Sequence, residues 1–419
     1  MNNKITPIII AFLATVSISL NAQNRELVND TLSMSPAYAM DVFYSMADGE
    51  VASVAREGWD IAFYTNAFSA GIIINEGNGT QLYSYPNSDT AGWATFDTVG
   101  MTSWKSLSNS NESWEDGAFN KNATGHPDYG WGIYNPVTHG LTGDSLYLIN
   151  VPGVGFKKLW MVDKVSVDNI YHIRYADVDG SNEMNVELAL KPYVSKNFAY
   201  YSLAKDELLD REPDTDWDIL FTKYIDLTPD NEGNMVEYLV TGATGNINRY
   251  ANKFYPVAAD YNDWSAKPFD SLKNTIGYDW KSFDMSTFSW VVDDSTAFFV
   301  MNQAGDVYKL VFTYWEGSSS GVFALQKELV QASFINDNIA DASILSIYPN
   351  PATDVLNIKA EKRLSGNLTI SDISGRVVFN EYIVDADFIT VNISNLTKGL
   401  YSISIDDSKS HNSGKFIVK

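Results

Sequence analysis

A serine between two glycines is the first group in the chain whose spacing suggests chemistry. The segment Gly317-Ser318-Ser319-Ser320-Gly321 fits the Gly-x-Ser-x-Gly pattern of hydrolases, in which the serine nucleophile stands on a turn between a strand and a helix. Here strand-forming residues flank the segment on both sides, no helical pattern follows, and the histidine downstream is His411. We therefore expect a hairpin turn with no catalytic residue, and we predict that the protein is not an enzyme.

An acidic segment could in principle hold a cation. Residues Asp177-Val178-Asp179-Gly180-Ser181-Asn182-Glu183 offer several oxygen atoms, but a full calcium loop needs more ligands at fixed offsets. The Asp-Gly pair instead marks a tight turn between two strands. We expect a hairpin turn here and no metal site.

Histidines are scarce in this chain and thiols are absent. There are four histidines, His126, His139, His172 and His411, and no cysteine. Without cysteine the chain has no disulfides, thiolate metal sites or cysteine nucleophiles. Taken singly, the loop residue His126, the turn residue His139 and the strand residue His172 each fit an ordinary surface or hydrogen-bonded histidine.

Four tryptophans lie in a stretch that is rich in Asn, Gly and Ser: Trp93, Trp104, Trp114 and Trp131. Exposed indole rings would stack on sugar rings, which is the chemistry of a glycan-binding surface. Burying such a ring is favourable by a few kcal/mol. Core positions are therefore the expectation, and a sugar-binding surface is the alternative.

Composition predicts an all-β protein with more than one domain. Aromatic residues make up 13% of the 419 residues, in short runs with Val and Ile that are separated by Gly, Asn, Asp and Pro, a pattern of strands and turns. A chain of this length favours two or three domains. The net charge of -23 and the pI of about 4.4 exclude nucleic acid as a partner, because phosphate binding requires clustered Lys and Arg.

The first 22 residues have the pattern of a secretory signal peptide. Lys4 precedes an apolar run from Ile8 to Leu20, which is followed by Asn21-Ala22-Gln23. The run is shorter than the ~20 apolar residues that cross a bilayer. We expect residues 1–22 to direct export and to be removed.

A self-comparison reveals two copies of one pattern. Tyr44-Ser45-Met46 followed by Trp59-Asp60-Ile61-Ala62-Phe63 recurs as Tyr201-Ser202-Leu203 followed by Trp217-Asp218-Ile219-Leu220-Phe221. In each copy a pair of strands joined by a Gly turn comes later: 146–149 with 158–161, and 297–300 with 309–312. We predict two tandem antiparallel β domains at residues 31–190 and 191–335, because repeats of this size are duplicated domains and not a solenoid.

These motifs resemble the HmuY family of haem-binding proteins. The residues that carry the resemblance are Phe43-Tyr44-Ser45, Trp59–Phe63, Trp131–His139 and Gly155–Leu159 in the first copy, and Phe198, Tyr200, Trp217–Phe221 and Lys309-Leu310 in the second. The resemblance implies haem as the cofactor. Haem iron takes axial His, Met, Tyr or Cys ligands. A bis-histidine site would have to use His126, His139 and His172 of the first copy, because the second copy has no histidine.

Two other features of the chain bear on a haem site. Met40, Met46, Met101 and Met161 would be softer ligands, although Met among aromatic strands is more often core filling. In so acidic a protein, Lys157, Lys158 or Arg174 would have to stand near the haem propionates.

Residues 343–419 resemble the C-terminal sorting domain of type IX secretion cargo. Three segments carry the resemblance: Ser346–Asp354, Asp372–Val378 and Lys398–Ile403. We expect a small Ig-like β-sandwich with strands at 368–370 and 401–405. The resemblance implies export by the type IX machinery, removal of the tail and attachment of the cargo to surface lipopolysaccharide.

The sequence therefore predicts a secreted binding protein at the cell surface. The first interpretation is capture of haem for uptake, with an outer-membrane haem receptor as a partner. The alternative is a surface adhesin or glycan-binding protein that has kept the scaffold without haem ligation.

Overall fold

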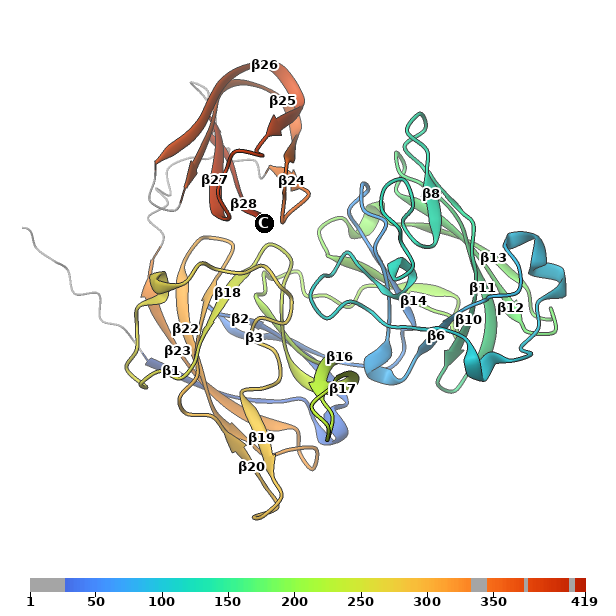
Figure 1. The fold of residues 1–419 in the computed structure, drawn as a ribbon, viewed down its shortest axis with the longest axis horizontal. Coiled ribbons are helices and arrows are strands. Elements are labelled where there is room, and N and C mark those ends of the chain that lie inside the picture. The colour runs from blue at the N-terminus through green and yellow to red at the C-terminus, as the bar shows by residue number, and fades with distance from the viewer. Residues whose placement is uncertain (1–26, 333–344, 373–375, 407–410) are drawn as a thin grey trace, which may run out of the picture.

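The computed structural model describes residues 27–332, 345–372, 376–406 and 411–419 (Figure 1). These residues form strands and short 3-10 turns, so the predicted all-β class is confirmed. The predicted signal peptide at residues 1–22 and the segment 336–342 between the predicted second domain and the tail lie outside the described residues. The 3-10 turns are η1 (Pro36–Tyr38), η2 (Glu76–Asn78), η3 (Thr90–Thr95), η4 (Met101–Ser103), η5 (Ala118–Asn120), η6 (Lys191–Tyr193) and η7 (Trp264–Ala266).

One part of the molecule, which we call body 1, contains strands β4 to β15. Its inner sheet has the order β15-β14-β4-β5, with β4 (Ile61–Tyr64), β5 (Ile72–Ile74), β14 (Phe198–Ser202) and β15 (Glu207–Leu209). Its outer sheet has the order β13-β12-β11-β10-β6-β7, with β9 added to β11 and β8 to β9. The outer strands are β6 (Gln81–Ser84), β7 (Ser106–Leu107), β8 (Gly132–Tyr134), β9 (Leu141–Gly143), β10 (Leu146–Val151), β11 (Gly155–Val165), β12 (Ile170–Asp177) and β13 (Met184–Ala189).

A second part, body 2, contains strands β1 to β3 and β16 to β23. Its inner sheet has the order β17-β16-β2-β3, with β2 (Met40–Ser45), β3 (Gly49–Ala55), β16 (Ile219–Pro229) and β17 (Met235–Gly245). Its outer sheet has the order β1-β23-β22-β21-β18. The remaining strands are β1 (Leu27–Ser33), β18 (Tyr250–Phe254), β21 (Ala297–Met301), β22 (Val307–Trp315), β23 (Val322–Gln331) and the separate hairpin β19 (Lys281–Asp284) with β20 (Ser289–Val292). The predicted strand pairs are present as β10 with β11 and as β21 with β22.

The two bodies exchange a strand. The aromatic strand β2 of the first copy pairs with β16 of the second, so that Tyr44 lies opposite Ile219. In the same way β14 of the second copy pairs with β4 of the first, and Tyr201 lies opposite Ile61. Strand pairing therefore crosses the boundary predicted at residue 190, because β1 to β3 belong to body 2 and β14 to body 1. The aromatic strands β2 and β14 have the same character, so either could complete either inner sheet. The exchange therefore keeps the cross-strand contacts that pairing within one copy would give.

The aspartates of the two Trp-Asp-Ile segments secure this exchange. The backbone N–H of Asp60 donates to the carbonyl of Tyr201, and one carboxylate oxygen of Asp60 accepts the N–H of Leu203 at 2.8 Å. The second copy repeats the arrangement: Asp218 donates to the carbonyl of Tyr44 and accepts the N–H of Met46 at 2.7 Å. Both carboxylates thus cap the turn that follows the exchanged strand, the role expected for them beside the buried tryptophans.

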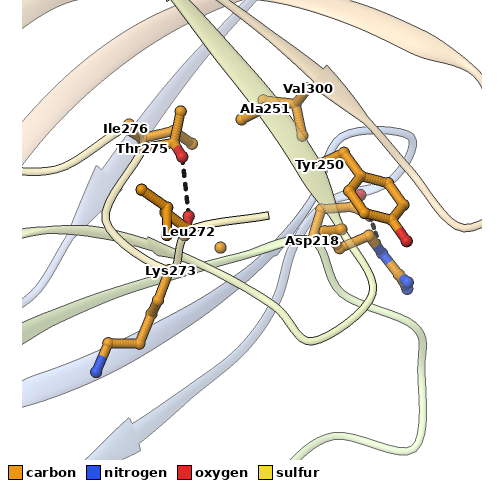
Figure 2. Close-up of a pocket in the computed structure, with 10 residues that line it drawn as sticks. Asp218, Tyr250, Ala251, Leu272, Lys273, Thr275, Ile276 and Val300 are labelled. Atoms are coloured by element: carbon orange, nitrogen blue, oxygen red, sulfur yellow. Dashed lines mark hydrogen bonds and ion pairs between the residues drawn. The ribbon is translucent and has the colours of Figure 1, made fainter. Parts of the chain in front are cut away.

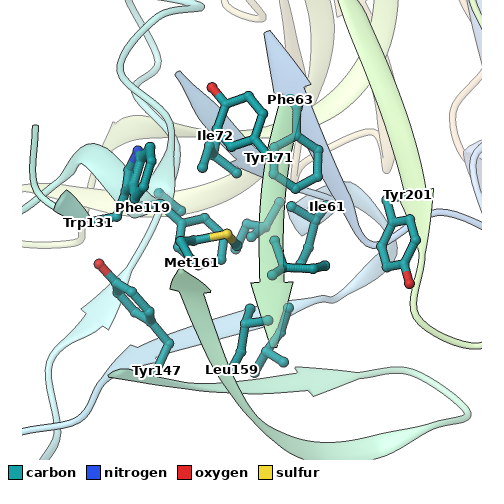
Figure 3. Packing of buried hydrophobic residues seen from close by; sticks show 14 of the residues in the cluster. Ile61, Phe63, Ile72, Phe119, Trp131, Tyr147, Leu159, Met161, Tyr171 and Tyr201 are labelled. Atoms are coloured by element: carbon teal, nitrogen blue, oxygen red, sulfur yellow. The ribbon is translucent and has the colours of Figure 1, made fainter. Parts of the chain in front are cut away.

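Each body has its own core. In body 1 the inner sheet contributes Ile61 and Phe63, the outer sheet contributes Met161 and Tyr171, and these side chains pack against one another in Figure 3. Trp131 enters the same core from a loop. A second cluster holds body 2 together, built on β2, β16 and the outer strands β21 to β23. Because each cluster combines both sequence copies, neither copy has a complete core without the exchanged strand.

The tail forms a third unit. The order of its strands is β24-β25-β27-β28, with β26 paired to β25: β24 (Ser346–Tyr348), β25 (Val355–Asp372), β26 (Val377–Asn392), β27 (Gly399–Asp406) and β28 (His411–Val418). Register shifts bend the long strand β25, and the sheet folds around a core of its own as the expected small sandwich. The tail contacts body 2, where the Tyr250 hydroxyl donates to the carbonyl of Lys415 and Ile417 joins an apolar cluster with Phe254. It also contacts body 1, where Tyr348 stacks on Phe68.

Candidate ligand-binding pocket

The two inner sheets face each other where the bodies meet, and a pocket lies between them. Strands β2, β4 and β14 are almost entirely buried, because one face packs on a core and the other on the opposite inner sheet. The space in the pocket is about 590 Å³, open solvent included. We call it the junction pocket. Its walls include Asp41, Phe43, Leu220, Thr222 and Lys223 of body 2, and Trp59, Gly77, Trp114, Tyr200 and Arg211 of body 1.

Aromatic rings form much of the wall. The Trp59 and Tyr200 rings meet edge to face with centroids 4.9 Å apart. Trp114 packs against apolar residues of both inner sheets, and its indole N–H donates to the carbonyl of Gly245 at 2.7 Å. A wall of this kind suits a ligand with an apolar or planar part.

One wall residue has an unused hydrogen-bond donor. Trp59 is 8% exposed, and its indole N–H has no partner among the described residues. Buried polar groups are almost always paired, so an unpaired donor on a pocket wall is a group to which a ligand can bind. By contrast, the indole N–H of Trp131 donates to the carbonyl of Ala70 at 2.9 Å inside the core.

Positive charge gathers at one side of the pocket. The guanidinium of Arg56 contacts the Asp41 carboxylate, with Nη2 2.8 Å from Oδ1. Arg211 approaches the other oxygen of Asp41 at 3.5 Å and lies over the rings of Trp59 and Tyr200. Two guanidinium groups therefore share one carboxylate.

A glutamate and a lysine, Glu76 and Lys273, also line the pocket. Burial raises the pKa of Glu76, whose oxygens accept the backbone N–H groups of Asn109 and Ile225. Burial also lowers the pKa of Lys273 to about 8, although Glu76 and Asp226 oppose this shift. Lys273 of body 2 donates to the carbonyl of Ser110 of body 1 at 2.5 Å, and this hydrogen bond links the two bodies.

A smaller pocket lies inside body 2 (Figure 2), with about 250 Å³ of space. Its lining includes Asp218, Tyr250 and Lys273, and the Thr275 hydroxyl donates to the carbonyl of Leu272 at 2.9 Å. The Asp218 carboxylate is already bound by Arg249 at 2.7 Å. The junction pocket is therefore the better candidate, because it is larger and because the indole N–H of Trp59 on its wall has no hydrogen-bond partner among the described residues.

The structure brings two of the three predicted haem ligands around one tyrosine. His139 Nδ1 lies 2.6 Å from the Tyr134 hydroxyl, and the His126 ring centroid lies 5.2 Å from that of Tyr134. Both histidines are exposed on loops of body 1. They lie in a segment that contributes no residue to the lining of the junction pocket.

His172 is held in the outer sheet of body 1. Its Nδ1 lies 2.6 Å from Asp163, and its Nε2 lies 3.6 Å from Glu187. The hydrogen bond to Asp163 raises the pKa of His172, and carboxylates contact both ring nitrogens that could ligate iron.

The cations named for haem propionates have other partners. Lys157 pairs with Asp177, and Arg174 pairs with Glu183 at 2.7 Å. Lys158 donates to the carbonyl of Trp93.

The other sequence candidates take the expected structural roles. Residues 177–183 form the turn between β12 and β13, where Ser181 and Asn182 donate to the carboxylate of Asp177. Residues 317–321 form the hairpin loop between β22 and β23. In the part of the chain that the structure describes, no group of three His, Cys, Asp or Glu residues is placed to hold a metal ion.

Three of the four tryptophans considered for sugar stacking are buried, as expected: Trp93, Trp104 and Trp131. Trp114 is half-buried on the wall of the junction pocket. Met46 and Met161 are fully buried core residues, which confirms the prediction of core filling for these two methionines.

Sequence analysis missed the charged residues of the junction pocket. Arg56 and Arg211 lie on no motif, and they approach each other only through strand exchange. Lys223 could have been noticed in the sequence. Thr222-Lys223 is a polar pair that interrupts the apolar strand after the second Trp-Asp-Ile segment.

Comparison with protein families gives one result for the tail. Residues 346–419 match the family "Secretion system C-terminal sorting domain", in agreement with the tail unit seen in the structure. The protein is therefore secreted through the type IX system, whose machinery its tail engages, and it resides at the cell surface or outside the cell. No helix among the described residues is long and apolar enough to span a membrane.

The other comparisons do not extend this result to the two bodies. No curated protein matches the chain. Among solved structures, "Novel fungal alcohol oxidase with catalytic diversity among the AA5 family, in complex with copper" is similar at 11% identity, covering 94% of this chain and 98% of that one, with a TM-score of 0.18. That score is too low for any argument about the fold.

Proposed function

We propose that this secreted surface protein is a binding protein, not an enzyme, and that it captures a small ligand in the junction pocket. Pockets between two structural units are common ligand sites. This pocket has aromatic walls on both sides and is built from both sequence copies. The observation that carries the proposal is the buried, unpaired indole N–H of Trp59 on the pocket wall.

Thermal shift measurements with a panel of metabolites test this proposal. A ligand that binds only the folded protein raises its melting temperature. The variant Leu220→Phe places extra volume in the junction pocket, whereas Leu239→Phe adds the same volume on the exposed part of β17. We expect at least one compound to stabilise the wild type and Leu239→Phe, but not Leu220→Phe. A panel without hits, or hits that Leu220→Phe retains, would contradict the proposal.

Haem capture remains a second candidate function, favoured by the two exposed histidines at Tyr134. In this version His126 and His139 ligate the iron, an outer-membrane receptor accepts the haem, and the protein is attached to surface lipopolysaccharide. Haem titration of the protein should give a shifted Soret band that is lost in His126→Ala/His139→Ala and kept in His172→Ala. An unshifted band, or one that the double variant retains, would refute this version.

A further inference from the structure

The junction pocket has an excess of positive charge within a strongly acidic protein. Arg211 and Lys223 line the pocket, and Arg56 lies behind the wall against Asp41, while the net charge of the chain is -23. The carboxylate within contact distance of the two arginines is that of Asp41. Glu76 and Lys273 also line the pocket, and their charges offset each other. Binding a negatively charged group would therefore reduce the electrostatic repulsion.

Asp41 is the shared acceptor for the two arginines, and most of its contacts fall on one oxygen. Its Oδ1 accepts from Arg56 Nε at 2.9 Å and from the Thr222 hydroxyl at 2.7 Å, and its Oδ2 lies 3.5 Å from Arg211. Arg56 is 4% exposed, yet its Nη1 has no hydrogen-bond partner among the described residues. A buried guanidinium with a free N–H group favours a further acceptor.

Lys223 adds a primary amine at the same place. Its side chain is half-buried and forms no ion pair or hydrogen bond within the described residues. Burial and the nearby charge of Arg56 both lower the pKa of Lys223, because the amine lacks a neutralising partner.

Gly77 packs closely against both Lys223 and Arg56. A Cβ atom at Gly77 would lie 2.5 Å from the carbonyl of Lys223 and 3.1 Å from Cδ of Arg56. Any side chain there would collide with the backbone, so glycine allows Arg56 and Lys223 to approach the same wall.

Apolar groups continue from the cationic side of the pocket. Arg211 lies over the Trp59 and Tyr200 rings, at 5.9 and 5.6 Å from their centroids. Phe43 and Leu220 line the pocket from the facing sheet. A ligand with an anionic end and a flat apolar body would match both parts.

Resting on the proposed function, we propose that the junction pocket selects small carboxylates with an aromatic body. The carboxylate accepts hydrogen bonds from Lys223 and Arg211, which line the pocket, and the buried Arg56 adds positive charge behind them. The ring lies against Trp59 and Tyr200, with the indole N–H of Trp59 as a further donor.

Matched pairs of probes test this selectivity on the purified protein. Benzoate and indole-3-acetate are compared with their primary amides, benzamide and indole-3-acetamide, which have the same shape without the charge. Dissociation constants are obtained by NMR titration. We expect each carboxylate to bind about tenfold more tightly than its amide, because hydrogen bonds to charged groups are about twice as strong as neutral ones.

Two variants locate the effect. Lys223→Met keeps the aliphatic stem and should weaken carboxylate binding about tenfold while leaving amide binding unchanged. Lys205→Met removes an exposed lysine outside the pocket and should change neither. If amides bind as tightly as carboxylates, or if Lys223→Met has no effect, the carboxylate inference fails while the binding pocket stands. If neither class of probe binds, both proposals fail.

Discussion

The two Trp-Asp-Ile segments do the same structural work in different electrostatic surroundings. Asp60 and Asp218 each cap the turn after the exchanged strand. Asp218 also pairs with the buried Arg249, whereas no cation contacts Asp60 within the described residues. A repeated backbone role thus leaves each copy free to vary the charges around it.

The anchors of the exchanged strands differ as well. The backbone N–H groups at the start of β14 donate to Glu212, at 2.9 Å from Asn197 and 3.0 Å from Phe198. The start of β2 is held by Arg56, whose Nη2 donates to the carbonyl of Met40 at 2.9 Å. One strand therefore depends on a carboxyl group that titrates, and the other on a guanidinium that stays charged.

Breaking the Arg249 pair should have the largest effect. In Arg249→Met the Asp218 carboxylate stays buried without a cation, and removing one partner of a buried pair costs about 3–5 kcal/mol. Urea denaturation measures the loss. The control Lys191→Met, which opens an exposed pair with Asp168, should cost less than about 1 kcal/mol. If the two variants lost equal free energy of unfolding, the Arg249–Asp218 pair would not be a stabilising feature that sets the second copy apart from the first.

The anchor of β14 should make stability depend on pH. Burial raises the pKa of Glu212 to about 7, although the N–H groups of Asn197 and Phe198 oppose this shift. Between about pH 4.5 and 7 the folded protein keeps a proton that the unfolded chain has released, so stability falls as pH rises. In Glu212→Gln the fall seen in denaturation curves should be smaller by roughly 1–3 kcal/mol, while Glu115, whose pKa burial also raises to about 7, keeps its own contribution. The exposed control Glu207→Gln should keep the wild-type slope, and an unchanged slope in Glu212→Gln would contradict the assignment.

The strands could be predicted from the sequence, but their partners could not. Aromatic runs and glycine turns located β10, β11, β21 and β22, and the tail motifs located β25 and β27. The exchange was hidden because Tyr44 and Tyr201 belong to the same repeated pattern. Either tyrosine strand satisfies either Trp-Asp-Ile strand, so local sequence does not determine which copy supplies it.

The pocket was unpredictable for the same reason. Asp41 and Arg56 meet within the β2–β3 hairpin, but Arg211 reaches them only after β2 has joined body 2 and faces body 1. The three histidines were found easily from the sequence, yet the structure sets His172 apart in ion pairs with Asp163 and Glu187.

The smallest effects on stability are expected at the two tryptophans, which ligand binding should separate. Trp59→Phe removes an indole N–H that makes no hydrogen bond, so it should cost about 1 kcal/mol, from lost packing alone. Trp217→Phe should cost a similar amount, because Trp217 packs edge to face on Phe43 as Trp59 does on Tyr200. Benzoate binding should weaken in Trp59→Phe and persist in Trp217→Phe. The comparison would break if both variants bound benzoate equally.

The most direct test is a crystal structure of the protein with the carboxylate probe that binds most tightly. The account predicts ligand density between the inner sheets, with the carboxylate at Lys223 and the ring against Trp59. Ligand density at the loops of His126 and His139, with the junction pocket empty, would contradict it.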